Sequence, residues 1–195
     1  MKLMIASDIH GSARYCSLLL EAYDREQAGS LLLLGDILYH GPRNDLPDLY
    51  APAKVAAALN ARKKDIFCVR GNCEAEVDQM MLEFPVMADY ALIFFNNLRI
   101  CATHGHIWNP DNLPPLQEGD ILLFGHTHVP FRESRGGILC LNPGSVSIPK
   151  GGSYRGYILL EDGVFRWKTL EGETVDTLRA QDRLTSGSAG DTARP

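Results

Sequence analysis

Short apolar runs, separated by polar or turn-rich stretches, set the pattern of the chain. The first run, Lys2–Ser7, predicts a buried strand, and apolar positions with helical spacing over Ser12–Ala28 predict an amphipathic helix that begins at a Ser12 cap. A second apolar run at residues 30–36 predicts another strand, and a helix is expected at Ala53–Asn60 after a polar loop. The first part of the chain therefore alternates strand and helix.

The rest of the chain is mainly strand candidates. They lie at residues 65–72, 91–95, 98–105, 120–128, 136–144, 155–162 and 163–170. Asn96 and Asn97 predict a tight hairpin turn between two of them. This order of elements predicts an α/β fold of two packed sheets with helices outside. We expect one domain over residues 1–184 and a disordered tail over residues 185–195, which are poor in apolar side chains.

Composition and charge indicate which partners and which location to expect. The 195 residues are 45% hydrophobic and 22% charged, which is typical of one globular domain. The net charge of −5 predicts no non-specific attraction to nucleic acid or to an anionic membrane, so an anionic small-molecule substrate must be held by local positive charge. No apolar stretch approaches the roughly 20 residues of a membrane span, and the first apolar run is too short for a signal peptide. Five scattered cysteines without a CxxC pair indicate reduced thiols in a cytoplasmic protein.

Polar side chains of an unusual kind follow five of the apolar runs, in the segments SDIHG, GD, GN, THGH and GHTH. Ligands of α/β sheets bind beyond the carboxyl ends of the strands. Each segment alone is compatible with ordinary turn chemistry, but all five in this order predict one shared site. Its candidate ligands are Asp8, His10, Asp36, Asn72, His104, His126 and His128.

The chemistry of this set indicates metal ions. Carboxylate, imidazole and amide ligands together suit borderline divalent ions such as Mn²⁺, Fe²⁺, Zn²⁺ or Co²⁺. The spacing of two within Asp8/His10 and within His126/His128 would direct each pair to one face if the backbone is extended. Seven ligands are too many for one tetrahedral zinc with an open position, but they suit two ions bridged by one carboxylate. Two ions about 3.5–4 Å apart can clamp both oxygens of an in-line phosphoryl displacement.

In this order, the motifs DIHG, GD, GNC, THGH and GHTH resemble those of the calcineurin-like metallophosphoesterases, over nearly all of residues 1–169. LGDILYHGPRN, RGNCEAEVDQM and NPGSVSIPKGG are more similar still to the YfcE-type bacterial phosphodiesterases of that family. The resemblance implies a four-layer α/β/β/α sandwich with two mixed sheets and a dinuclear metal site at the carboxyl ends of the strands.

The resemblance also implies which side chains hold each metal. The first ion would be held by Asp8, His10, Asp36 and His128. The second would be held by Asn72, His104, His126 and the bridging Asp36. We expect Mn²⁺ in both positions, with Zn²⁺, Fe²⁺, Co²⁺ or Ni²⁺ as alternatives.

The implied activity is hydrolysis of phosphodiesters, in which a metal-bound hydroxide attacks phosphorus without a covalent intermediate. Two divalent ions bring four positive charges, and Asp8 and Asp36 cancel two of them. A hydroxide and a monoanionic diester would neutralise the remainder. Metal binding can lower the pKa of water from about 15.7 toward 7, so the hydroxide is available at neutral pH. The expected catalytic residues are Asp36, Asn72, Cys73 and His104.

Cys73 departs from the wider family, in which a histidine at this position helps the leaving oxygen to depart. A thiol with a pKa near 8.5 is a poor substitute for an imidazolium donor. We therefore interpret Cys73 as a residue that lines the pocket, while a weak donor or a nucleophile remain alternatives. Without the acid, diesters with aryl leaving groups should be the best substrates.

Other residues are expected near the site. His40 and Arg43 follow the bridging Asp36 and could reach the substrate, as could His106. The segment NPGSVSIPKGG is expected to border the site. Trp108, Trp167 and the Phe94-Phe95 pair indicate core or oligomer contacts, so the chain could form a homo-oligomer.

Four other functions are alternatives. A phosphomonoesterase or a cyclic-nucleotide phosphodiesterase would use the same ligands. A non-catalytic scaffold, such as the retromer subunit of this superfamily, should have lost ligand residues, whereas all seven are present. A redox di-iron protein would need a carboxylate-rich site on helices.

Overall fold

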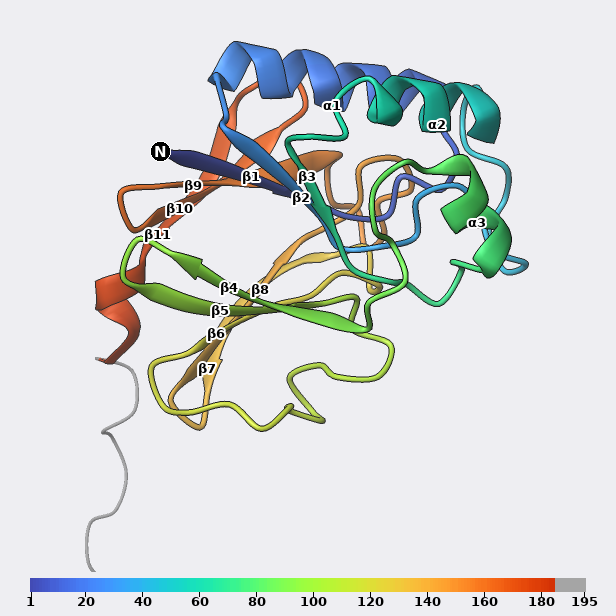
Figure 1. Cartoon of the computed structure of the whole chain (residues 1–195). Coiled ribbons are helices and arrows are strands. Elements are labelled where there is room, and N and C mark those ends of the chain that lie inside the picture. The colour runs from blue at the N-terminus through green and yellow to red at the C-terminus, as the bar shows by residue number, and fades with distance from the viewer. Residues whose placement is uncertain (185–195) are drawn as a thin grey trace, which may run out of the picture.

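Two mixed β-sheets packed face to face form the body of the protein in the computed structural model, which describes residues 1–184 (Figure 1). The six-stranded sheet has the order β11-β10-β9-β1-β2-β3. Its strands are β1 (Lys2–Ala6), β2 (Ser30–Leu33), β3 (Ile66–Cys68), β9 (Gly156–Glu161), β10 (Val164–Thr169) and β11 (Thr174–Arg179).

The second sheet has five strands in the order β4-β5-β6-β8-β7. They are β4 (Tyr90–Phe95), β5 (Leu98–Thr103), β6 (Ile121–Leu123), β7 (Pro130–Arg135) and β8 (Ile138–Pro143). The helices are α1 (Ala13–Glu26), α2 (Pro52–Asn60) and α3 (Glu76–Met81), and a 3₁₀ turn covers Ala180–Leu184. Strands β1, β2 and β3 run parallel, as do β5, β6 and β8, so the carboxyl ends within each group meet at one edge.

The alternation of side chains along β1 explains how the layers are held together. Leu3 and Ile5 lie in the hydrophobic core between the two sheets. Met4 and Ala6 point the other way, into the core that the six-stranded sheet forms with α1 and α2. Because both faces are covered, the strand is apolar throughout, as is typical of a buried parallel strand.

The predicted α/β class with two mixed sheets is confirmed, with one local difference. The outer face of the five-stranded sheet, around Leu122 and Phe124, is packed against Leu113 and Leu116. These two leucines belong to segment 104–120, in which the described chain forms turns and loops rather than a helix. A loop layer therefore stands where the sandwich was expected to have its second helical layer.

Local signals in the sequence were largely correct. Ser12 caps α1 by accepting a hydrogen bond from the backbone N–H of Tyr15, although the helix ends at Glu26, two residues before the predicted end. Asn96 adopts a φ of 53° in the turn between β4 and β5, as the hairpin prediction requires. Strands β7 and β11 and helix α3 were not predicted, because the two strands are exposed edges and the helix is short.

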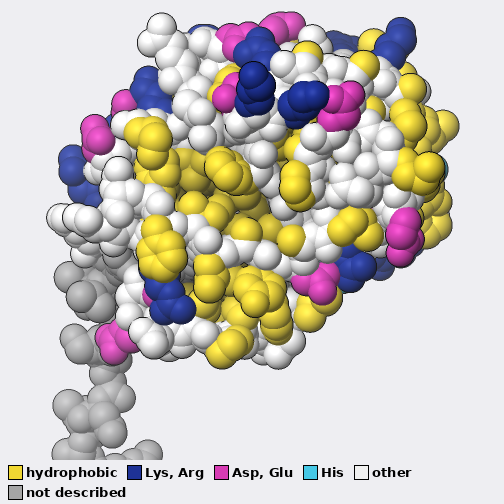
Figure 2. Space-filling model, in the orientation of Figure 1, with side chains coloured by type: hydrophobic (Ala, Val, Ile, Leu, Met, Phe, Trp, Pro, Cys, Tyr) yellow, Lys and Arg dark blue, Asp and Glu magenta, His cyan; other side chains and the backbone are white. Residues whose placement is uncertain are grey.

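The predictions for the large aromatic residues and for the C-terminal tail have different outcomes. Trp167 is a core residue whose indole N–H donates to the carbonyl of Asn142. Figure 2 shows hydrophobic side chains gathered across the middle of the face on which β3 and β4 lie. Phe67 and Phe94 are exposed on these strands, and the expected homo-oligomer stays a prediction for this face. The expected tail lies outside the described residues.

Among residues 1–184, no helix combines the length and the apolar character needed to cross a membrane. The single-domain boundary at residue 184 stays a prediction.

Candidate metal centre

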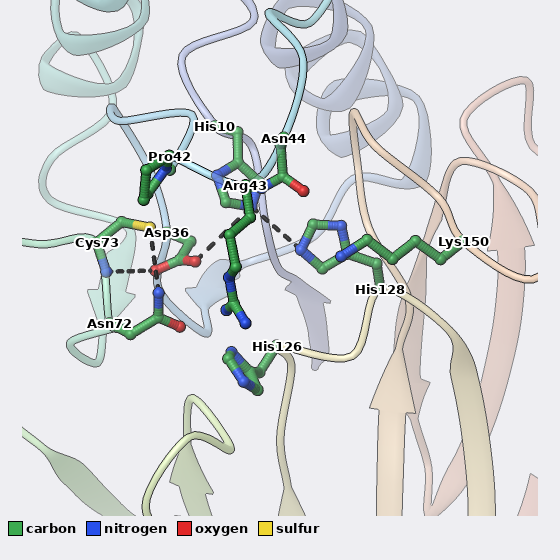
Figure 3. Close-up of a pocket in the computed structure, with 11 residues that line it drawn as sticks. His10, Asp36, Pro42, Arg43, Asn44, Asn72, Cys73, His126, His128 and Lys150 are labelled. Carbon is green, nitrogen blue, oxygen red and sulfur yellow. Dashed lines mark hydrogen bonds and ion pairs between the residues drawn. The ribbon is translucent and has the colours of Figure 1, made fainter.

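The seven expected ligand residues come together in the loops that follow the carboxyl ends of β1, β2, β3, β5 and β6. Figure 3 shows five of them, from both sheets, around one small cavity. From the six-stranded sheet come Asp8, His10, Asp36 and Asn72, and from the five-stranded sheet His104, His126 and His128.

The first group of side chains surrounds Asp8. The Nε2 atoms of His10 and His128 lie 3.5 Å and 3.3 Å from Asp8 Oδ1. They are 3.2 Å from each other. His10 Nε2 also lies 3.7 Å from Asp36 Oδ2, so the group contains two imidazoles and two carboxylates.

The second group surrounds His104. Its Nε2 lies 3.1 Å from Asn72 Oδ1 and 3.2 Å from His126 Nδ1. The same nitrogen is 3.4 Å from Asp36 Oδ2. Oδ2 of Asp36 is therefore the atom that the two groups share.

The backbone at these positions differs from the expected extended conformation. Asp8, His10, Asp36, His126 and His128 all have positive φ values, between 49° and 67°. Left-handed backbone is uncommon for residues other than glycine and costs of order 1–3 kcal/mol each. The inference that spacing by two in an extended strand aligns the pairs was wrong. Tight left-handed turns at the strand ends direct these side chains into the site instead.

The segment NPGSVSIPKGG donates hydrogen bonds to the backbone of these turns. The hydroxyls of Ser145 and Ser147 both donate to the carbonyl of Asp8, at 2.8 Å and 3.1 Å. The amide of Asn142 donates to the carbonyl of Gly125 at 2.7 Å, next to His126. The expected bordering loop thus anchors the ligand-bearing backbone by hydrogen bonds, which offset part of the conformational cost.

Glu74 joins the ends of β2 and β3, a role that the sequence reasoning missed. Its buried carboxylate accepts backbone hydrogen bonds from Asp36 and Ile37, at 2.8 Å and 2.7 Å, and from Gly71 at 2.5 Å. Gly71 is needed for this approach, because a Cβ there would lie 2.2 Å from Asp36 Oδ1. The sequence signal that could have identified Glu74 is its position directly after Asn72 and Cys73.

The hydrogen bonds of the histidines fix which nitrogen faces the centre. Nδ1 of His10, His104 and His128 lies 2.9, 2.6 and 2.6 Å from the backbone carbonyls of residues 39, 34 and 148. A carbonyl only accepts, so each Nδ1 carries a proton, and in the neutral form of each ring the Nε2 lone pair faces the site. Two such lone pairs, on His10 and His128 with their Nε2 atoms 3.2 Å apart, repel each other unless a proton or a metal ion lies between them.

The buried carboxylates also require positive charge nearby. Asp8 and Asp36 are almost completely buried, and among residues 1–184 the basic groups within 4 Å of them are all histidines. Although burial opposes ionisation of Asp8, its contacts with His10 and His128 hold its pKa well below the usual range. Burial lowers the pKa of His104, but Asp36 and Asp8 outweigh it and raise that pKa to about 9. Buried charge of this kind is normally paired or binds metal, so the residues fit divalent cations.

The cavity has a volume of about 40 Å³, and its lining includes two basic residues, Arg43 and Lys150. Figure 3 shows Arg43 extending toward His126 from the loop after β2, as expected from the sequence. Lys150 was missed, although it belongs to the NPGSVSIPKGG segment, and its backbone N–H donates to the carbonyl of His128. Asn44 also lines the cavity and was missed, because only the path of its loop brings it there.

Cys73 lies at the wall of this cavity. Its backbone N–H donates to Asp36 Oδ1 at 2.9 Å, and its sulfur accepts from the amide of Asn72 at 3.2 Å. Burial, together with the negative charge of Asp36, raises the pKa of the thiol far above its ordinary value. The thiol is therefore protonated and placed beside the centre.

His40 and His106 lie behind the cavity rather than on its wall. The ring of His40 packs edge-on against Tyr39 and Tyr50. The ring of His106 lies 5.4 Å from that of His104, and burial followed by the charge of His104 lowers its pKa. Neither residue lines the cavity. Direct substrate contact by these two histidines therefore has less support than contact by Arg43.

Comparisons with known proteins indicate the same family as the sequence motifs do. A family model for the calcineurin-like phosphoesterase superfamily domain matches residues 1–162. Phosphodiesterase YfcE of Escherichia coli strain K12 is 49% identical over 175 residues, which cover 90% of this chain and 95% of that protein. The probable metallophosphoesterase YsnB of Bacillus subtilis strain 168 is 24% identical over 196 residues, covering 95% of this chain and 99% of that protein.

A solved structure agrees with the arrangement of the layers. The phosphoesterase YfcE from E. coli superposes with a TM-score of 0.89 and 46% identity, covering 92% of this chain and 100% of that chain. The resemblance expected from the motifs is confirmed over nearly the whole chain, and the fold class with it.

Proposed function

Because this chain belongs to the calcineurin-like phosphoesterase superfamily, we propose that it is a metal-dependent phosphodiesterase acting on a small-molecule diester. The observation that carries the proposal is the shared Oδ2 of Asp36, which lies 3.7 Å from His10 Nε2 and 3.4 Å from His104 Nε2. One carboxylate oxygen between two groups of inward-facing ligand atoms suits a pair of bridged ions. The naming of the E. coli relative as a phosphodiesterase supports the same activity.

In this proposal the two groups described above each hold one ion. The ligands of the first are Asp8, His10, Asp36 and His128, and those of the second are Asp36, Asn72, His104 and His126. Divalent ions held by these residues would supply a nucleophile at neutral pH, because metal binding lowers the pKa of water toward 7. Asn72 contributes an oxygen without adding negative charge, which keeps the site cationic enough for an anionic substrate.

Arg43 and Lys150 orient the substrate from the open side of the cavity. Both residues are exposed and line the cavity, so their side chains can reach non-bridging phosphoryl oxygens, and the guanidinium fork of Arg43 can bind two of them. The backbone N–H of Lys150 donates to the carbonyl of His128, so this loop is connected directly to the turn that carries a proposed ligand.

Cys73 lines the pocket in this mechanism and does not attack the substrate. A thiol is a weak donor compared with an imidazolium, so a departing alkoxide receives little help. We propose that diesters with aryl leaving groups, whose oxygen departs unaided, are the best substrates. A cytoplasmic location is part of the proposal, because the five cysteines are free.

Reconstitution with metal tests the proposal. Protein dialysed against a chelator should lose hydrolysis of bis(p-nitrophenyl) phosphate, and Mn²⁺ should restore it better than Mg²⁺, since imidazole is a poor ligand for Mg²⁺. The release of p-nitrophenol, recorded beside the metal content of each sample, is the measurement. Full activity in excess chelator, with no metal left in the protein, would contradict the proposed function.

A further inference from the structure

A second and larger cavity lies directly beside the metal centre. Its volume is about 340 Å³, compared with about 40 Å³ for the cavity over the ligands. His126 lines both, so the two cavities meet at this residue. A volume of this size is within the range of small-molecule pockets, which run from about 300 to 1,000 Å³.

The inner wall of this second cavity is apolar and aromatic. Phe124 is buried and its ring meets that of Phe131 edge-on, with the ring centroids 5.7 Å apart. Val129 and Pro110 complete the apolar lining, and Gly105 forms a wall without a side chain. A Cβ at Gly105 would lie only 3.2 Å from the carbonyl oxygen of Gly125, so the backbone comes close there. These surfaces match a flat, uncharged ring better than a polar group.

The polar residues at the rim are already paired. Arg135 contacts Asp111 at 2.6 Å and Glu133 at 3.2 Å, so its one positive charge faces two negative charges. The amide of Asn109 donates to the carbonyl of Gly105, and its oxygen accepts from the backbone N–H of Asp111. Among the lining residues the charges of Arg135 and Asp111 cancel, and Arg135 is also paired with Glu133 outside the lining, so the cavity offers no unpaired Lys or Arg side chain to a second phosphate.

We infer that this cavity is a subsite for one ester substituent of the diester, and that the substituent is an uncharged aromatic ring. The inference rests on the proposed function, because the phosphoryl group must occupy the metal centre on the other side of His126. The ring would pack against Phe131 and Val129 and extend the substrate away from the ions.

The rival position is a third cavity of about 300 Å³ on the opposite side, which Cys73 lines together with Tyr39, Val77 and Met81. Its aromatic side chains, Tyr39 and Tyr50, both pack edge-on against His40, whereas Phe124 and Phe131 of the cavity beside His126 pack against each other. A further ring can join an aromatic pair in an offset or edge-on arrangement, and the two phenylalanines, unlike the two tyrosines, carry no hydroxyl group. We therefore assign the ring to the cavity beside His126.

Two non-hydrolysable monoanions test this assignment by calorimetry on the Mn²⁺-loaded protein. Methyl(phenyl)phosphinate and dimethylphosphinate have no ester bond and differ by one ring, so the ratio of their dissociation constants reports the binding free energy that the ring contributes. We expect the phenyl compound to bind wild type about 10-fold or more tightly. Val129→Trp, which fills the cavity, and Phe131→Ala, which removes a wall, should each bring this ratio close to one.

Val77→Trp is the matched control, since it adds the same side chain to the rival cavity and should keep the wild-type ratio. A ratio that is unchanged in both Val129→Trp and Phe131→Ala, or one that is lost in Val77→Trp instead, would overturn the assignment. Calorimetry does not depend on turnover, so a wild-type protein that binds the ring but does not hydrolyse bis(p-nitrophenyl) phosphate would refute the proposed function and leave the subsite standing.

Discussion

At the scale of single residues, Asp36 has the most constrained environment in the site. Its side chain lies within reach of both groups of ligand atoms, its backbone is left-handed, and its N–H is held by the buried carboxylate of Glu74. Asp8 is similarly buried but lies within 4 Å of His10 and His128 alone among the described basic groups. The two aspartates should therefore respond differently to the same substitution.

Asp36→Asn should abolish turnover and reduce metal binding at both positions, because one negative oxygen serves two ions. Asp8→Asn should mainly weaken the position that His10 and His128 share. Metal content per chain, measured by mass spectrometry after dialysis against buffer with trace Mn²⁺, distinguishes the two variants. Two ions per chain retained in Asp36→Asn would show that Asp36 does not bridge.

Cys73 allows a test of the leaving-group argument. A positioned general acid contributes about 10²–10⁴-fold, and the gain is largest for basic leaving groups. Cys73→His should therefore improve hydrolysis of alkyl diesters and cyclic nucleotides more than that of aryl diesters. Cys73→Ser should remain close to wild type on aryl diesters, because a hydroxyl is nearly the size of a thiol that only lines the pocket.

The measurement for Cys73 is the dependence of kcat/KM on the pKa of the leaving group in the three proteins. Equal dependence in wild type and Cys73→His would rule out the missing acid. A collapse of Cys73→Ser on every substrate, together with inactivation of wild type in step with alkylation of this thiol, would instead indicate a nucleophile.

At the scale of elements, the site depends on how the loops after β2 and β3 are joined. Glu74 comes from the second loop and binds the backbone of Asp36 and Ile37 in the first, and it also closes its own loop through Gly71. It contacts none of the ions' proposed ligand atoms, so it is a positioning residue. Its carboxylate has two accepting oxygens, and all three donors that meet them are backbone N–H groups.

Glu74→Gln should cost about 1–3 kcal/mol of stability, because either orientation of the amide sets its NH₂ group against a backbone donor. It should also weaken metal binding of the folded protein by about 10-fold, as is typical when support behind a ligand is lost. Urea unfolding and metal titration measure the two effects. Glu76→Gln, an exposed change two residues away, is the control and should stay within about 0.5 kcal/mol. Unchanged metal affinity in Glu74→Gln would reduce this residue to a structural role.

The elements also show which parts of the fold and site a single sequence can predict. Buried strands such as β1 have continuous apolar runs, so their ends, and with them Asp8 and Asp36, could be located. Strands β7 and β11 lie at sheet edges with mostly exposed side chains, and no apolar pattern marks them. Lys150 and Asn44 reach the cavity through the three-dimensional path of loops, which local pattern does not contain. The left-handed turns were missed because Asp and His tolerate both conformations.

At the scale of the whole molecule, the metal centre connects the two sheets. Asp8, Asp36 and Asn72 follow strands of the six-stranded sheet, whereas His104 and His128 follow strands of the other. The apolar core between the sheets holds them together in any case, through residues such as Leu3 and Ile5. Ions bound between the two sets of loops would add a second connection at the edge of the sandwich, close to the turns with strained backbone.

Metal binding should therefore stabilise the whole domain against unfolding. A ligand at 100 times its dissociation constant stabilises the folded state by about 2.7 kcal/mol, which for a chain of this size is a rise in Tm of roughly 5–10 °C. Thermal unfolding of chelator-treated protein, with and without Mn²⁺, measures this shift. Asp36→Asn should unfold at nearly the same temperature in both conditions, since its ligand groups no longer share an oxygen. A Tm of wild type that does not respond to Mn²⁺, in samples shown to contain the metal, would mean that the unfolded chain binds the ions as tightly as the folded protein does, and would contradict a site built by the fold.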